Sequence, residues 1–306
     1  MHDQAAVPPA VPAPTRAEAH GFALGALGVL VFALTLPMTR LAVGDSTAPQ
    51  LPPAFVTAGR AAGAGLLSLA WLAWAGWPRP RRSELGVLVV SALGTVLGFP
   101  LFIALALRHV EAMHAAVVTG VIPLATAVAA ALVLRQRASP AFWALALLGC
   151  ALVVAFALVA GGGRLAWADV LLLAAVASAA VGYVAGAQAA RRMPAEQVIC
   201  WVLVISLPLT LPATLATWPE AGARTSAWLG FGYVTLFSMW LGFFAWYRGL
   251  ALGGVMRVSQ VQLVQPFLAL LAAVPLLGER LEPLTLGFAL AVVAVVFAGR
   301  RVPAAR

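Results

Sequence analysis

The sequence predicts an all-α integral membrane protein with ten transmembrane helices arranged as two inverted five-helix repeats. Of its 306 residues, 63% are hydrophobic and 9% are charged, against roughly 25% charged in an ordinary soluble domain. The apolar residues form long runs that are separated by short links rich in Pro, Gly and Arg. Two of these runs, one in each half of the chain, repeat the same positions of Pro and Arg. The composition therefore excludes most classes of soluble enzyme.

Ten apolar runs are long enough to cross a hydrocarbon core of about 30 Å as helices. We expect them near residues 20–42, 54–76, 84–107, 111–134, 141–160, 167–190, 196–217, 226–250, 254–277 and 283–300. The links between them are GDSTAPQLPP, PRPRRS, RHVE, RQRASP, GGGRL, RRMPAE, PEAGARTS, ALGG and GERLEP, and links this short make consecutive helices antiparallel neighbours. The first run is interpreted as a retained helix and not as a signal peptide, because nine runs follow it and no clear small-residue cleavage site closes it.

The chain divides at the midpoint of these runs. Residues 1–19 are rich in Pro and Ala without apolar periodicity, which predicts a disordered cytoplasmic tail. The first five-helix repeat is expected over residues 20–160 and the second over 161–302. A carboxylate in the first turn meets the positive end of the helix dipole, and four predicted helices start this way, at Glu84, Glu111, Asp169 and Glu196. No Asp or Glu falls at mid-membrane depth, so a buried carboxylate proton relay is not expected.

The basic residues predict the orientation in the membrane. All 19 are Arg, and the formal net charge is +9. If the N-terminus is cytoplasmic, 13 Arg residues fall on the inner side and 6 on the outer side. Because cytoplasmic loops carry the excess of positive charge, we expect a multi-pass protein of the plasma (inner) membrane with both termini in the cytoplasm. The scattered Arg residues suit a lipid surface and do not indicate nucleic acid.

Motifs for catalysis, metals and cofactors are missing from the sequence. Cys150 and Cys200 each lie inside an apolar run, which supports neither a disulfide framework nor a metal site. A phosphate-binding loop would need Lys, and the chain has none. Paired aspartates, HExxH and a nucleophile elbow are also missing. We therefore expect no enzyme, no catalytic residue, no cofactor and no metal.

An internal repeat relates the two halves. RHVEAMHAAVVTGVIPLATAVAAALVLRQRASP aligns with ALGGVMRVSQVQLVQPFLALLAAVPLLGERLEP, so that three pairs coincide: Pro123 with Pro266, Arg137 with Arg280, and Pro140 with Pro283. Each half contains five predicted spans, an odd number, so the second copy enters the membrane in the opposite orientation. Inverted repeats allow a transporter to alternate between inward-open and outward-open states around a site near the membrane midplane.

The stretch from Tyr247 to Arg280 resembles the EamA-type branch of the drug/metabolite transporter superfamily. It shows an aromatic-ended helix, a small-residue turn, a polar helix with a central Pro and a closing Gly-Glu-Arg. The first half carries a weaker copy, with Gln136 in place of the Glu. Arg60, in AFVTAGRAAGAGLL, resembles an Arg that the family often carries in its second helix. The resemblance covers residues 20–300 and implies ten helices and export or exchange of small metabolites, without implying a substrate.

Polar residues within the predicted spans are candidates for the substrate pathway. Arg60 lies about seven residues inside the second span, where lipid exposure is costly. It contacts substrate or gate, or it snorkels to the interface or has a structural role. In the ninth span, one face carries Ser259, Gln262, Gln265 and Pro266. These residues either line a pore or hold helices together through hydrogen bonds.

Aromatic and titratable residues complete the set of candidates. Trp240 and Tyr247 share a face of the eighth span, as cavity wall or interfacial anchors. Thr119 and Tyr183 are further pathway residues, although Thr hydroxyls often bond their own helix. His114 and Arg257 occupy equivalent positions in the two copies, near opposite faces of the membrane, and are predicted to be paired gates or interfacial residues.

These observations favour a secondary transporter, exporter or exchanger, of a small polar organic metabolite such as an amino acid. It would work by alternating access between the two inverted halves. The alternatives are an exporter of cationic drugs, for which the expected cavity lacks a carboxylate, and a membrane-embedded enzyme. A channel is disfavoured by the internal repeat. The expected partners are the small-molecule substrate and the lipid bilayer, with no nucleic acid, and the protein is expected to be a monomer or homodimer.

Overall fold

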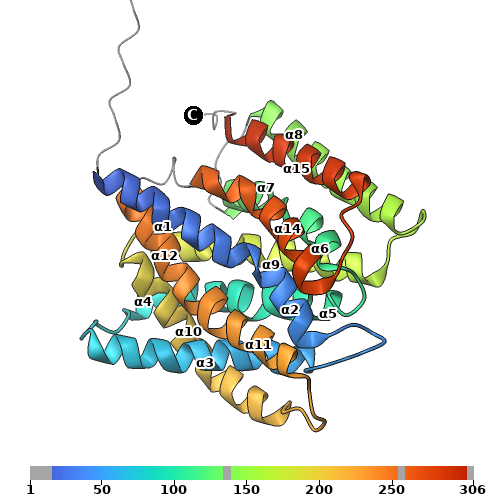
Figure 1. Cartoon of the computed structure of the whole chain (residues 1–306). Helices are drawn as coiled ribbons and strands as arrows, with labels where there is room; N and C mark the ends of the chain where they lie inside the picture. The colour runs from blue at the N-terminus through green and yellow to red at the C-terminus, as the bar shows by residue number, and fades with distance from the viewer. Residues whose placement is uncertain (1–15, 134–138, 254–258, 302–306) are drawn as a thin grey trace, which may run out of the picture.

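The structure is a computed structural model that describes residues 16–133, 139–253 and 259–301. Within these residues the chain forms helices and connecting loops, and its β-structure is limited to a single bridge between Gly44 and Pro49. The helices pack side by side in one bundle (Figure 1). The prediction of an all-α protein is therefore confirmed for the described part of the chain.

Eight of the helical segments are long and apolar enough to cross a membrane. They are Arg16–Val43, Pro53–Trp74, Arg82–Ala106, Ala112–Val133, Pro140–Ala160, Trp167–Ala189, Ala195–Ala216 and Thr225–Gly249. Two shorter apolar helices follow, Val261–Leu277 and Pro283–Gly299. The segments lie where the ten runs were predicted, and eight of them reach spanning length. The protein is thus a multi-pass membrane protein.

The first half of the chain contains several interrupted spans. The elements are α1 (Arg16–Ala33), α2 (Thr35–Val43), α3 (Pro53–Trp74), α4 (Arg82–Ser91), π-helix η1 (Ala92–Gly98), α5 (Phe99–Ala106), α6 (Ala112–Thr119), α7 (Ile122–Val133) and α8 (Pro140–Ala160). Residues 16–19 were expected in the N-terminal tail but belong to α1, where Glu18 stands in the first turn and favours the helix start. The rest of that predicted tail, residues 1–15, lies outside the described residues.

The second half also contains interrupted spans. Its elements are α9 (Trp167–Ala189), α10 (Ala195–Ala216), α11 (Thr225–Tyr233), π-helix η2 (Val234–Leu241), α12 (Gly242–Gly253), 3₁₀-helix η3 (Ser259–Val264), α14 (Gln265–Leu277) and α15 (Pro283–Arg301). Residues 254–258, the start of the predicted ninth span, lie outside the described residues.

Irregularities occur at matching places in the two halves. When the halves are aligned through Pro123 and Pro266, the π-helices η1 and η2 end at equivalent positions and begin at nearly equivalent ones. The fourth and ninth predicted spans are each broken just before the aligned proline, Pro123 in α7 and Pro266 in α14. Proline removes a backbone hydrogen bond of the preceding turn, so these breaks follow from the sequence.

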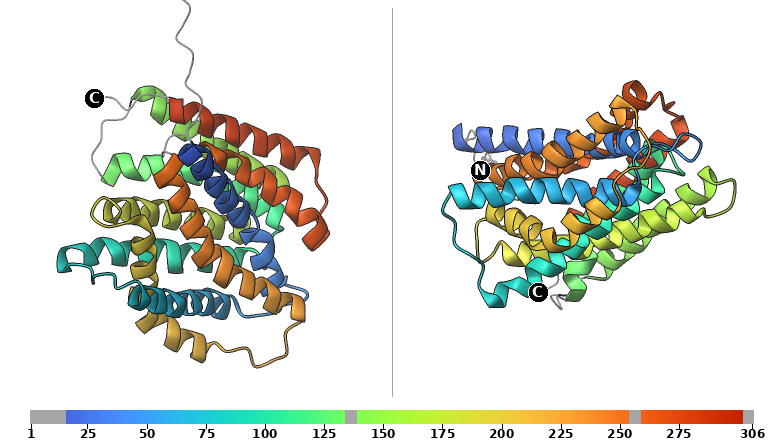
Figure 2. Two further views of the ribbon diagram at one scale, coloured as in Figure 1. Left: turned by 60° about the vertical axis from the view of Figure 1, so that its left-hand side comes forward. Right: turned by 90° about the horizontal axis from the view of Figure 1, so that it is seen from below.

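The two halves interlock. The most extensive contacts join α1 to α12 and α3 to α10, and further contacts join α9 to α5 and α7. Close approach depends on small residues, because a Cβ on Gly249 of α12 would lie 2.5 Å from the backbone N of Gly25 in α1. At the edge of the bundle α8 packs against α15 (Figures 1 and 2). Neither half is therefore a compact unit by itself.

Candidate functional site

A central cavity of about 370 Å³ lies between the two halves. Its wall comes from the middle of the first, third and fourth spans, together with α3, the C-terminal half of α9, the N-terminal half of α10, and η2, α12, η3 and α14. The cavity therefore runs from mid-membrane toward the end of the bundle where α9 ends and α10 begins. We call this the cavity end. Its volume lies in the range of small-molecule sites.

Arg60 is buried in α3 and lines this cavity. Its residue surface is only 4% exposed, and Nη2 donates a hydrogen bond to Oγ of Ser238 in η2 at 3.0 Å. The Ser238 hydroxyl also shares a 2.8 Å hydrogen bond with Oγ1 of Thr35, the first residue of α2. Nε of Arg60 is buried without a partner within the described residues. The lining position shows that Arg60 does not snorkel to the interface.

The polar face predicted for the ninth span also reaches the cavity. Gln262 in η3 and both Gln265 and Pro266 at the start of α14 line it. The 3₁₀-helix η3 ends two residues before Pro266. Because proline has no backbone N–H, it cannot donate a hydrogen bond to a carbonyl of η3. The backbone of Ser259 begins η3, but its side chain lies outside what the structure describes. The irregular backbone thus faces a cavity, as is required inside a membrane.

Aromatic side chains make up much of the remaining wall. The cavity-lining aromatic residues are Phe32, Phe99, Tyr183, Phe243, Trp246 and Tyr247. Of the predicted candidates, Tyr183, Tyr247 and Thr119 are therefore at the cavity. The Thr119 hydroxyl donates to the backbone oxygen of Ala115 at 2.7 Å, as is common for helical Thr. Whether these residues act in transport remains a prediction.

Trp240 does not line the cavity, contrary to the expectation that it forms part of the wall. It packs edge-on against Trp71 and Phe244, with ring centroids 6.4 and 5.3 Å away. Ser238 lines the cavity from η2, and a residue two positions further along a helix points to another side.

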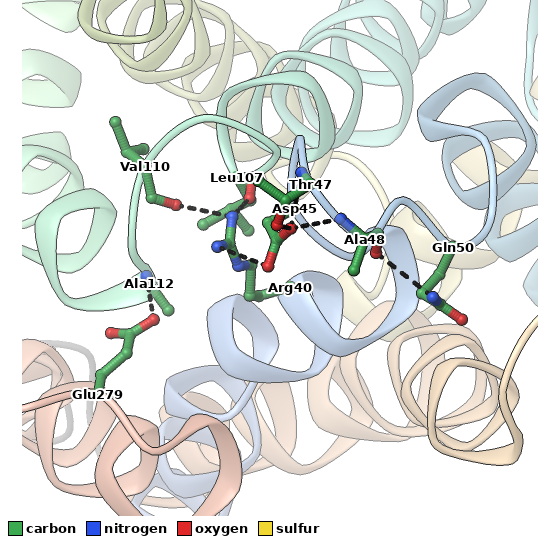
Figure 3. Close-up of polar contacts among 9 residues, drawn as sticks. All are labelled: Arg40, Asp45, Thr47, Ala48, Gln50, Leu107, Val110, Ala112 and Glu279. Atoms are coloured by element: carbon green, nitrogen blue, oxygen red, sulfur yellow. Dashed lines mark hydrogen bonds and ion pairs between the residues drawn. The ribbon is translucent and has the colours of Figure 1, made fainter.

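Polar contacts close the opposite end of the bundle (Figure 3). Nη1 of Arg40, in the last turn of α2, donates to the backbone oxygens of Leu107 and Val110, and Nη2 lies 3.7 Å from Asp45. The carboxylate of Glu279 accepts the backbone N–H groups of Ala112 and Met113 at 2.7 and 2.8 Å. These N–H groups belong to the first turn of α6, which has no preceding turn to bond.

A hydrogen bond between a histidine and an aspartate adds to this closure. Nε2 of His114 in α6 lies 2.7 Å from Oδ1 of Asp169 in α9, while Oδ2 of Asp169 accepts the backbone N–H of Ala166. We call Arg40, His114, Asp169 and Glu279 the clamp, and this end of the bundle the clamp end. None of the four lines the cavity. Arg257, predicted to pair with His114 as a gate, lies outside the described residues.

Burial raises the pKa of Glu279 above its ordinary value of 4.5. The two backbone N–H groups and Arg40 act in the opposite direction, and the nearby carboxylate of Glu111 adds to the increase. By contrast, the pKa of exposed Asp45 is lowered, first by the hydroxyl of Thr47 and then by the N–H of Ala48. The protonation of Glu279 is therefore set by the balance between its burial and its polar neighbours in the clamp.

Sequence reasoning did not single out Ser238, Arg40 or Glu279 as site residues. Ser238 could have been found, because the alignment of the repeat places it opposite Thr95, and both residues line the cavity. Arg40 was counted only as a topology signal. Glu279 was noted only as part of the closing Gly-Glu-Arg.

Comparison with known proteins defines the class. The model of the EamA-like transporter family matches residues 19–158 and 166–299, and the chain belongs to this family. The resemblance seen in the sequence is therefore confirmed, and the class is one of membrane transporters, not of enzymes.

Among individual proteins, the chain is similar to the "Uncharacterized transporter YdeK" of Bacillus subtilis (strain 168). The two are 43% identical over 284 residues, covering 92% of this chain and 97% of that protein. A solved structure described as "Crystal structure of protein" matches with a TM-score of 0.60 and 22% identity, over 91% of this chain and 97% of the other. This second likeness shows the fold alone.

Proposed function

We propose that the protein is a secondary transporter, an exporter or exchanger, of a small polar organic metabolite such as an amino acid. The observation that carries the proposal is the central cavity, which lies between the halves and extends to one end while the clamp joins the halves at the other end. A cavity closed at one end is what alternating access requires of one of its two states.

The proposal includes ten transmembrane helices in two inverted repeats, over residues 20–160 and 161–302. The matching π-helices and proline breaks support it, as do the two segments matched by the family model. The two short apolar helices supply the ninth and tenth spans. The Arg distribution supports a plasma (inner) membrane location with both termini cytoplasmic, which makes the described conformation inward-facing.

The substrate pathway in this proposal includes Arg60, Gln262, Gln265, Pro266, Thr119, Tyr183 and Tyr247, all of which line the cavity. The solute and the bilayer are its partners, without a cofactor or nucleic acid, in a monomer or homodimer. A cavity with an Arg and amides is poorly suited to cationic drugs, since among its described lining residues none carries a carboxylate.

The test is uptake and counterflow in liposomes containing the purified protein. Pools of amino acids, organic acids, nucleobases and cationic dyes are compared for the wild type, Gln262→Ala and the control Gln188→Ala, which alters an amide outside the cavity. We expect saturable flux of one polar pool that Gln262→Ala weakens and Gln188→Ala does not. Flux of the cationic dyes alone, or no flux from folded, inserted protein, would contradict the proposal.

A further inference from the structure

Arg60 is the one charged side chain among the described residues that line the cavity. No carboxylate of the described chain lies within 4.0 Å of it, because the two ion pairs found there are Arg40–Asp45 and His114–Asp169. Inserting an Arg side chain at the centre of a membrane helix costs about 2.5–3.5 kcal/mol on insertion scales. A guanidinium without a counter-ion is therefore unfavourable there. Its natural complement is an anion that enters the cavity.

The guanidinium has donors left for such an anion. Arg carries five N–H groups, and within the described residues one of them is used in a hydrogen bond, the 3.0 Å bond from Nη2 to Oγ of Ser238. The hydroxyl pair of Ser238 and Thr35 holds the planar group on one side at the cavity wall. A carboxylate can accept two parallel N–H bonds from the free edge of such a group.

The repeat shows that this cationic position belongs to one half only. In the alignment that pairs Pro123 with Pro266, Ser238 corresponds to Thr95 and Thr35 corresponds to Ser178. The second pair does not repeat this arrangement, because Thr95 donates its hydroxyl to the backbone oxygen of Ser91 at 2.7 Å and Ser178 is not among the residues that line the cavity. At the position equivalent to Arg60 stands buried Leu203. The described lining therefore carries its one charge in the first half only.

We propose that the transported solute is a monocarboxylate whose remaining part is uncharged, with its carboxylate bound by Arg60 beside Ser238. One cation in a region of low dielectric is neutralised by one negative charge. A dianion, or a zwitterion with its ammonium group, would place a second charge where the described lining offers no counter-ion. The rest of the solute then packs against the aromatic wall that includes Phe243 and Trp246.

This inference rests on the proposed function, and it narrows the amino-acid expectation to solutes without the ammonium group. Isocaproate, leucine and isoamylamine test it, because the three share one branched skeleton and carry net charges of −1, 0 and +1. Counterflow of each is measured in proteoliposomes, and binding in detergent is followed by tryptophan fluorescence, since Trp246 lines the cavity.

Four proteins are compared: the wild type, Arg60→Leu, Arg60→Lys and the control Arg164→Leu, which removes one exposed charge. We expect the wild type to carry isocaproate in preference to the other two solutes. Arg60→Leu should lose about tenfold or more in isocaproate affinity, the loss expected for charge-assisted hydrogen bonds. Arg60→Lys should keep part of the affinity as a point charge, and Arg164→Leu should match the wild type. Arg60→Leu also loses the bond to Ser238, so its elution profile in detergent is compared with that of the wild type, and Arg60→Lys, which keeps the charge, separates loss of binding from loss of folding.

The outcomes separate the inference from the proposed function. Faster exchange of leucine or isoamylamine than of isocaproate, or isocaproate affinity unaffected by Arg60→Leu, overturns the monocarboxylate assignment and leaves the transporter standing. Binding of isocaproate that requires Arg60, without flux of any solute, supports the site and overturns the transport function.

Discussion

The two ends of the bundle are closed to different degrees and by different chemistry. At the clamp end, charged side chains join the halves: Glu279 of the second half bonds α6 of the first, and His114 of the first half bonds Asp169 of the second. At the cavity end, the described lining of α9, α10 and α12 is small, aliphatic or aromatic, as at Gly186, Val198 and Tyr247. Charged contacts are directional and depend on protonation, whereas apolar contacts are neither.

The difference lies in the sequence of the repeat. Glu279 of the second copy aligns with Gln136 of the first, a residue outside the described part of the chain. An amide cannot titrate in the way that a carboxyl group does. Of the two aligned closing motifs, only the one with Glu279 thus carries an ionisable group at this position, and the clamp end can be perturbed selectively.

The largest effect is expected from Glu279→Ala. The change removes two charge-assisted hydrogen bonds, each contributing about 1.5–3 kcal/mol, and leaves two N–H groups of α6 without partners. The equilibrium should shift toward an open clamp end by more than tenfold. The measurement is the labelling of an Ala116→Cys reporter at the cavity wall by a membrane-impermeant maleimide added only on the clamp side of the membrane, in a protein without Cys150 and Cys200.

Glu282→Ala is the matched control, because it removes an exposed carboxylate from the same loop. It should label at the parent rate. Equal labelling rates for Glu279→Ala and Glu282→Ala would show that the cap on α6 does not close this end.

A smaller effect is expected from His114→Ala. The variant loses one contact between α6 and α9 and the packing of the imidazole against Phe156, at 4.9 Å between centroids. Asp169 keeps its bond to Ala166, so α9 still starts normally. Labelling of the same reporter should rise by several-fold, about what one buried hydrogen bond contributes. His114→Gln keeps a donor for Asp169 and should restore most of the protection; failure of this rescue would contradict the role of the pair.

The smallest effect is expected from pH. The pKa of Glu279 is raised in the closed clamp by burial, and it returns toward its ordinary value when the carboxyl group is hydrated. A group whose pKa is raised in one conformation binds protons more tightly there, so acid favours the closed clamp. The thiolate fraction of any cysteine rises with pH, so each labelling rate is divided by the rate of Glu279→Gln, which stays neutral, at the same pH. This ratio should be smallest below pH 4.5 and rise as the pH passes upward through the raised pKa. A ratio that does not change with pH would contradict the role of Glu279.

Much of the fold could be predicted from the sequence, because it depends on composition and on the length of apolar runs. The carboxylates expected in first turns illustrate this: those of Glu84 and Asp169 each accept the N–H three residues earlier, as the dipole argument requires. The π-helices could not be predicted, since an extra residue in a turn leaves no mark on apolar periodicity.

The site was predicted less completely, because its contacts join distant parts of the chain. Arg60 and Gln262 could be identified, since polar groups in an apolar span must face something other than lipid. The partner of Arg60, Ser238, lies 178 residues away. Asp169 was interpreted as a helix-start residue, and its second oxygen bonds His114 as well. A sequence shows which groups need partners, and only packing shows which partners they find.

The bond between Arg60 and Ser238 also bears on how the protein is made. Translation is directional, so α3 leaves the ribosome long before η2 exists. Until then Arg60 lacks its hydroxyl partner, and α1 and α3 lack α12 and α10, the helices that cover them in the finished protein. The contacts that bury Arg60 and cover α1 and α3 therefore form only after the second half has been made.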